Sequence, residues 1–308
     1  MKVCVLGDSF GAAVSDTFTS PDESEKEQAT PMTLPADSHV HSEFSWDAPR
    51  GAMEKTCARA AELGLPVIAF TEHLDHTAWP APTDGPYANL SESAGPDGLV
   101  TPPPFDVDGY LATIERCRDL FPALRILTGL ELGEPHWHAD AIAKVLAAGP
   151  FQRVIGSLHC LPHNGGYAEP FGIYPDRPAA EVVRDYLLEI PNVVAGSDVF
   201  EILTHIDYPI RHWPGPETFD PRDFEEEFRH ALRATAEAGR ALEINTRLGF
   251  DRLIVTWWHE EGGDAVSFGS DAHYPEAVAH GLREAADMAE ACGFRPGDSP
   301  FELWGRVG

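Results

Sequence analysis

The sequence predicts an α/β fold, a barrel of seven βα units with its active site at the carboxyl ends of the strands. Short apolar runs alternate with helical stretches along residues 35–308, which is the pattern of βαβ units and a parallel sheet. Several runs are apolar throughout, such as Val67–Phe70, as expected of parallel strands buried on both faces. Seven such units favour a barrel over an open sheet.

The strands and helices follow one another in a regular order. The runs expected as strands are Asp37–Val40, Pro66–Phe70, Arg125–Leu130, Arg153–Ser157, Phe200–Thr204, Ala241–Ile244 and Ala265–Phe268. The expected helices are Gly51–Leu63, Asp106–Phe121, His136–Ala148, Pro178–Ile190, Pro221–Ala238, Asp251–Glu261 and Pro275–Ala291. Several of these helices open with Pro or Asp, which are common at helix N-termini, and Gly64 is placed to end the first one.

Three segments depart from this rhythm. Residues 74–104 and 160–177 are long connections without helical periodicity, and connections of this length are typical of lids or binding loops. Residues 1–34 are expected to be an N-terminal extension or linker, because Ser15–Pro35 is rich in small, acidic and Pro residues. Within this extension, Val3–Gly7 could form a short strand. The rest, residues 35–308, is expected to form the barrel.

Composition excludes several classes of function. The chain has 50 acidic and 22 basic residues, a net charge of −28, which repels nucleic-acid phosphates and anionic membranes. No apolar run approaches the roughly 18 residues that a membrane helix needs, and the N-terminal residues do not resemble a secretory signal. The five Cys are widely spaced and form no CxxC pair, so we expect a cytoplasmic protein without a disulfide framework.

Side chains at the strand ends point to metal chemistry. Six His and two acids lie at the ends of six different expected strands: His39, His41, His73, Glu131, His159, His205, Asp271 and His273. The carboxyl ends of parallel barrel strands meet on one face. Histidine and carboxylate together are the ligand set of Zn, Mn or Fe, so we expect a metal site on that face.

The same motifs resemble a known family. HVHSEFSWD, AFTEH, GLE, SLH, THID, EIN and GSDAH, in this order, are similar to the polymerase-and-histidinol-phosphatase (PHP) domain, from about Pro35 to the C-terminus. The GSLH, THID and EINT segments are most similar to its histidinol-phosphatase branch. The resemblance implies a distorted (β/α)7, TIM-like barrel that holds three divalent metal ions.

The resemblance also assigns ligands by position. It places the first metal on His39, His41, Glu131 and Asp271, the second on Glu131, His159 and His205, and the third on His73, His273 and Asp47. Two positions depart from the family pattern: Glu72 stands where many relatives have Asp, and Asn245-Thr246-Arg247-Leu248-Gly249 stands where the branch continues NTSG. These departures bear on substrate identity more than on metal binding.

The expected chemistry is hydrolysis of a phosphate monoester. A water shared between cations loses a proton near neutral pH and becomes a hydroxide nucleophile, and the cations neutralise the phosphate oxygens. Glu131 and Asp271 serve this reaction as ligands. Glu72 and Asp207 lie beside ligands and could orient a His or act as general acid.

Four further residues are candidates for substrate binding. Arg211 and Arg247 follow strand ends, and Arg suits bidentate binding of phosphate. His163 and His212 lie in loops on the same face, where binding residues concentrate. The branch resemblance implies a small phosphorylated substrate, histidinol phosphate of histidine biosynthesis.

Three alternatives remain open at this point. The long connections could select another sugar or nucleotide phosphate, or a phosphodiester. The domain could be a non-catalytic metal-binding module, since fold does not fix function. A two-metal amidohydrolase is disfavoured, because Lys55 and Lys144 fall within helices and no expected strand ends in Lys. The sequence does not predict an oligomeric state.

Overall fold

The computed structural model of the protein describes residues 34–82, 88–215 and 217–307. A central sheet contains the parallel strands β1 (Asp37–Val40), β2 (Val67–Leu74), β5 (Arg125–Gly133), β6 (Arg153–Ser157), β9 (Ile202–Leu203), β10 (Ala241–Asn245) and β11 (Ala265–Gly269). Each strand pairs in parallel with the next. The seven expected strands and the α/β barrel class are therefore confirmed. The expected extension, including Val3–Gly7, falls outside the described residues except for Leu34 and stays a prediction.

The barrel closes only at the carboxyl ends of its first and last parallel strands. Val40 and Ala272 form a parallel bridge there, and the Asp271 amide donates to the His39 carbonyl at 2.8 Å. The start of β11 pairs instead with β13 (Trp304–Arg306), which pairs with β12 (Phe294–Arg295). This C-terminal hairpin distorts the barrel. The barrel remains closed at the carboxyl ends of β1 and β11, where His39 and Asp271 lie close together.

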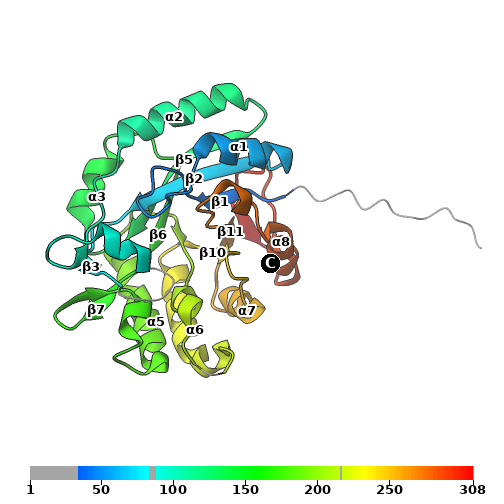
Figure 1. Cartoon of the computed structure of the whole chain (residues 1–308). Coiled ribbons are helices and arrows are strands. Elements are labelled where there is room, and N and C mark those ends of the chain that lie inside the picture. Colours follow the sequence, from blue (N-terminus) through cyan, green and yellow to red (C-terminus); the bar gives the residue numbers. More distant parts are fainter. Residues whose placement is uncertain (1–33, 83–87, 216, 308) are drawn as a thin grey trace, which may run out of the picture. The chain divides into compact units, whose positions relative to one another are not determined.

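Helices cover the outside of the sheet (Figure 1). The α-helices are α1 (Met53–Glu62), α2 (Val107–Leu120), α3 (Ala139–Leu146), α4 (Pro170–Ile173), α5 (Ala179–Gly196), α6 (Glu225–Glu237), α7 (Arg252–Glu260) and α8 (Leu282–Ala291). Short 3-10 helices are η1 (Ala88–Ser93), η2 (Tyr208–His212), η3 (Pro221–Phe224) and η4 (Pro275–Ala277). Within the described ranges, no helix combines the length and apolar character that crossing a membrane requires.

Two helix predictions are wrong in their extent. The helix expected to end at Ile190 continues through Pro191 as part of α5, because burial of its apolar face there outweighs the roughly 3 kcal/mol cost of an internal Pro. The helix expected over Pro275–Ala291 is divided into η4 and α8. Ala279 and Gly281 between them have left-handed backbones, with φ of 60° and 65°, which interrupts the helix.

The described parts of the two long connections form walls at the carboxyl face of the barrel. Residues 74–104 contain the antiparallel pair β3 (Trp79–Pro80) and β4 (Leu99–Val100). Residues 160–177 contain the hairpin of β7 (Leu161–His163) and β8 (Gly166–Ala168), followed by α4. Buried residues of both connections pack in one apolar cluster, which includes Trp79, Val100 and Cys160. This packing fixes the walls relative to the strand ends.

Candidate metal centre

Glu131 on β5 lies at the centre of the strand-end residues. Its Oε2 atom is 3.1 Å from Nε2 of His39 and 3.4 Å from Nε2 of His41. Its Oε1 atom is 2.8 Å from Nε2 of His205 and 3.3 Å from Nε2 of His159. The carboxylate is 1% exposed. Its Oε2 atom is also 3.2 Å from Nδ1 of His73. One side chain therefore faces two separate sets of histidines with its two oxygens.

The first group of donors gathers at the closed seam of the barrel. His39 and His41 leave the end of β1, and Asp271 follows β11. Asp271 Oδ1 is 3.6 Å from Nε2 of His41 and 3.9 Å from Nε2 of His39. Asp271 has a φ of 53°, a left-handed backbone that Asp tolerates better than most residues. This turn directs its carboxylate to the two histidines.

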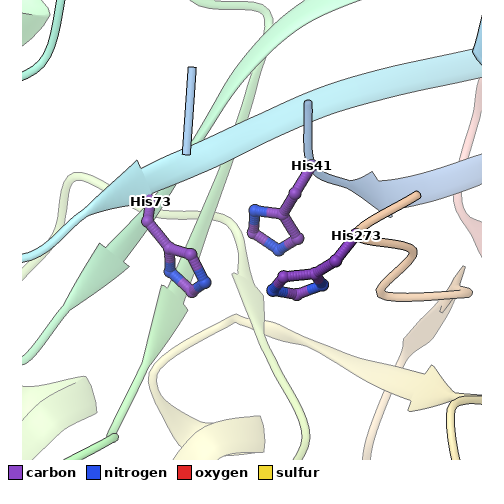
Figure 2. Close-up of side chains that lie close together, drawn as sticks. All are labelled: His41, His73 and His273. Atoms are coloured by element: carbon purple, nitrogen blue, oxygen red, sulfur yellow. The ribbon is translucent and has the colours of Figure 1, made fainter. Parts of the chain in front are cut away.

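A further group surrounds Asp47. Figure 2 shows His41, His73 and His273 directed toward one another from β1, β2 and the loop after β11. Asp47 Oδ2 is 3.1 Å from Nε2 of His273 and 3.5 Å from Nε2 of His73. The structure thus brings together every residue that the sequence proposes as a metal ligand.

Outer partners orient two of these histidines. Glu243 on β10 contacts Nδ1 of His39 at 2.7 Å, and Ser45 Oγ contacts Nδ1 of His41 at 2.9 Å. The Ser45 hydroxyl in turn donates to Glu72 at 2.6 Å. Such partners fix which ring nitrogen faces a metal. Sequence reasoning gave Glu243 no role, although its position near the carboxyl end of a barrel strand could have indicated one.

The donor set fits cations. Nε2 of His39 and Nε2 of His41 are 3.0 Å apart, an approach that requires a shared proton or a cation. Within the described part of the chain, the buried atoms Nδ1 of His73, Nδ1 of His205 and Oδ1 of Asp47 have no hydrogen-bond partner. Buried polar atoms are normally satisfied, and convergent histidine and carboxylate donors are the chemistry that transition-metal ions take.

Electrostatics keeps the carboxylates ionised. Burial acts to raise the pKa of Glu131, but the surrounding imidazoles, His39 foremost, hold it well below its usual value. Burial likewise opposes ionisation of Asp271, and Arg211 and then Arg247 hold its pKa well below normal. Burial lowers the pKa of His205 to about 4, so this ring is neutral near pH 7 and free to act as a ligand.

A cavity of about 250 Å³ opens over these groups. Arg211 and Arg247 line it and bind opposite oxygens of Asp271, at 2.6 and 3.1 Å. Arg50 also lines the cavity, with its guanidinium 4.3 Å from the centre of the Tyr274 ring. Sequence reasoning missed Arg50, because its position beside the site depends on the fold of the loop after β1. The other walls are largely aromatic, with Trp46, Trp79 and Tyr208.

Four candidate residues lie away from this cavity. His163 pairs with Asp176 at 3.0 Å in a separate hollow, because the β7–β8 hairpin carries it outward. His212 packs against Phe171. Asp207 is half-buried, and the removal of its carboxyl group from water raises its pKa to about 6. Neither lines the cavity. The substrate contacts of the two histidines and the general-acid role of Asp207 stay predictions.

Glu72 also requires a correction. It is fully buried, does not line the cavity, and accepts hydrogen bonds from Ser42 and Ser45. It therefore cannot give a proton to a substrate. Its contact with Ser45, which in turn contacts Nδ1 of His41, is consistent with the orienting role, which stays a prediction.

The chain resembles known proteins over most of its length. Residues 37–247 match the PHP domain. The histidinol-phosphatase of Lactococcus lactis is 28% identical over 269 residues, which cover 84% of this chain and 91% of that protein. A protein named "Probable histidinol-phosphatase" from Clostridium acetobutylicum is 25% identical, over 84% of this chain and 94% of its own length.

Solved structures agree on the fold. The Lactococcus lactis histidinol phosphate phosphatase, solved in complex with zinc, L-histidinol and phosphate, superposes with a TM-score of 0.72. The two proteins are 24% identical in this comparison, which covers 88% of this chain and 99% of the other.

Proposed function

The chain belongs to the PHP domain family, and we propose that it is a metal-dependent phosphatase whose substrate is histidinol phosphate. The observation that carries this proposal is the Glu131 carboxylate, whose two oxygens face two different sets of histidines. Relatives that share most of the chain's length are named histidinol-phosphatases, which supports the choice of substrate.

Three divalent ions fit the groups of donors. We place the first on His39, His41, Glu131 and Asp271, the second on Glu131, His159 and His205, and the third on His73, His273 and Asp47. Zn, Mn and Fe all suit this mixture of imidazole and carboxylate. When bound, such ions lower the pKa of water and supply positive charge for the phosphate oxygens.

Two arginines act at different points of the site. Arg211 is 8% exposed and holds Asp271 at 2.6 Å, so its main task is to keep this carboxylate in place. Arg247 lines the cavity and is 33% exposed. We expect Arg247 to bind the phosphate in a charge-assisted contact.

The walls of the cavity favour a small substrate. A volume of about 250 Å³ holds a compact molecule rather than a polymer. Trp46, Trp79 and Tyr208 offer flat apolar surfaces beside the donor groups, which suits the ring of an aromatic alcohol. The same residues exclude water from the remainder of the substrate.

A phosphate-release assay tests the substrate. The protein, loaded with zinc or manganese, is given histidinol phosphate, glucose 6-phosphate, AMP and a phosphodiester. We expect kcat/KM for histidinol phosphate to exceed the others by at least about 100-fold. Equal or greater activity on another ester would reject histidinol phosphate and keep a phosphoesterase. A protein that binds metal and cleaves none of these esters would contradict the phosphatase itself.

A further inference from the structure

Asp75 stands outside the proposed ligand set, yet it contacts two of its histidines. It follows β2 directly, and its side chain is 9% exposed. Its Oδ1 atom is 3.3 Å from Nδ1 of His159, and its Oδ2 atom is 3.4 Å from Nδ1 of His73. One buried carboxylate therefore joins a histidine of the second metal site to a histidine of the third.

The nitrogen that Asp75 contacts on His159 is the one turned away from the second site. Nε2 of His159 faces Oε1 of Glu131 at 3.3 Å, so Nδ1 remains to donate its proton to Asp75. Glu243 contacts His39 in the same way, through Nδ1, while Nε2 faces Glu131. A carboxylate on the far nitrogen fixes the tautomer and makes the near nitrogen a better donor.

The His73 ring is oriented in a similar way, with Nε2 toward a metal site and Nδ1 near Asp75. Its Nε2 atom lies 3.5 Å from Asp47, on the side of the third site. Its Nδ1 atom is buried and has no hydrogen-bond partner in the described residues. This atom lies between two carboxylates, 3.4 Å from Oδ2 of Asp75 and 3.2 Å from Oε2 of Glu131. The Trp46 indole N–H donates to the same Oδ2 at 2.9 Å. Trp46 precedes Asp47, so the loop that carries Asp47 also supplies the donor that holds Asp75.

We propose that Asp75 is a positioning residue that orients His159 and His73 together and so couples the second and third metal sites. This inference rests on the metal assignment of the proposed function. It does not depend on the identity of the substrate, because the contacts of Asp75 are with the ligands themselves.

Metal binding by the variants Asp75→Asn and Asp75→Ala provides the test. Zinc is titrated into chelator-treated full-length protein and followed by calorimetry, with bound zinc counted after dialysis. We expect two of three ions to bind about 10–100-fold more weakly, and the ion on His39, His41 and Asp271 to keep its affinity. Asn should lose less than Ala, since its amide oxygen still accepts one hydrogen bond.

Two further variants guard against a general loss of folding. Glu189→Gln is the matched control, because Glu189 pairs with the non-ligand His136 at 2.9 Å and its loss should leave zinc affinity unchanged. Trp46→Phe removes the donor that holds Asp75 and should weaken the same two ions to a smaller extent. In wild type, zinc binding should shift the Trp46 fluorescence, and Asp75→Asn should move that shift to higher zinc concentration.

The outcomes separate this inference from the proposed function. Unchanged affinity for all three ions in Asp75→Ala would overturn it, and so would the loss of a single ion, which would make Asp75 an ordinary ligand. A wild-type protein that binds three ions but does not cleave histidinol phosphate would refute the proposed substrate alone. A wild-type protein that binds fewer than three ions would refute the metal assignment, and the coupling with it.

Discussion

Glu131 shows how much of the site depends on one side chain. Its two oxygens face His39 and His41 on one side and His159 and His205 on the other. It is held by β5 between two paired neighbours, so its direction is fixed by the sheet. Removal of its charge alone should therefore weaken metal binding at two positions.

We predict that Glu131→Gln loses metal from two sites and at least about 100-fold in activity, since a bridging carboxylate supplies charge to both ions. Elemental analysis after dialysis counts the ions, and phosphate release measures the activity. The ion on His73, His273 and Asp47 should remain. Full metal content with full activity would rule out the bridging role.

Glu169 gives a pH-dependent prediction at the same scale. Burial raises the pKa of Glu169 from its ordinary value of 4.5 to about 7, and the Tyr208 hydroxyl donates to its carboxyl group at 2.6 Å. Between these pH values the folded protein keeps a proton that the unfolded chain releases, so the free energy of unfolding falls as pH rises. This loss is complete once the pH exceeds about 7.

Glu169→Gln removes that titration. In chelator, the variant should gain on the order of 3 kcal/mol in stability relative to wild type between pH 4.5 and 7.5. Urea unfolding at both pH values measures the difference. A difference between the two proteins that does not change with pH would show that Glu169 is not buried as a neutral acid.

At the scale of elements, the contact between β2, β5 and β6 leaves no room at Gly129. A Cβ atom there would lie 2.6 Å from the Arg153 carbonyl and 2.7 Å from Cγ2 of Thr71. These neighbours are backbone and a branched side chain in paired strands, so they cannot move cheaply. The close packing positions Glu131, two residues further along β5.

We therefore expect Gly129→Ala to lower the free energy of unfolding by about 1–3 kcal/mol. Gly305→Ala is its control, because a Cβ at this position of β13 meets nothing within 4 Å. Denaturant unfolding of both variants provides the measurement. Equal stabilities for the two variants would mean that the strands around Gly129 can spread at little cost.

The sequence predicts the parallel strands well, because strands that are buried on both faces consist of continuous apolar runs. It also predicts that the proposed ligands lie close together, because strand ends in a barrel share one face. It cannot predict that Pro191 lies inside α5, where tertiary packing overrides the local preference. His163 is misplaced for a similar reason, since a hairpin within a long connection decides where it points.

The roles of Glu243, Arg50 and Asp75 depend on distances between elements. Glu243 reaches His39 across 204 positions of sequence, and Arg50 reaches the cavity through its contact with Tyr274. Residue type and spacing in the sequence do not reveal such contacts. The family pattern proposes which residues bind the metals, and the structure shows the side chains that contact these residues and orient them.

For the whole molecule, charge and metal binding are linked. The chain carries a net charge of −28, which by itself repels a phosphate ester. Divalent ions in the cavity reverse the local sign and offset the repulsion among the acids that line it. The donors come from strands along the whole sheet, so bound ions tie the barrel together.

Metal removal should therefore destabilise the fold. Ions that bind only the folded chain add about 4 kcal/mol per site at a free concentration of 1,000 times Kd. We expect a chelator to lower the melting temperature measured by calorimetry, and added zinc to restore it. A smaller effect of chelator on Glu131→Gln would follow from its lost sites. A melting temperature that does not change when chelator is added would contradict metal binding to the native state.

The most direct measurement of the central claim is anomalous X-ray diffraction from zinc-loaded crystals. We predict three zinc peaks in the cavity, two of them on opposite oxygens of Glu131 and the third among His73, His273 and Asp47. Zinc–donor distances of about 2.0–2.2 Å should identify the ligands. Peaks that do not include Glu131 between two ions, or peaks confined to one site, would contradict this account of the centre.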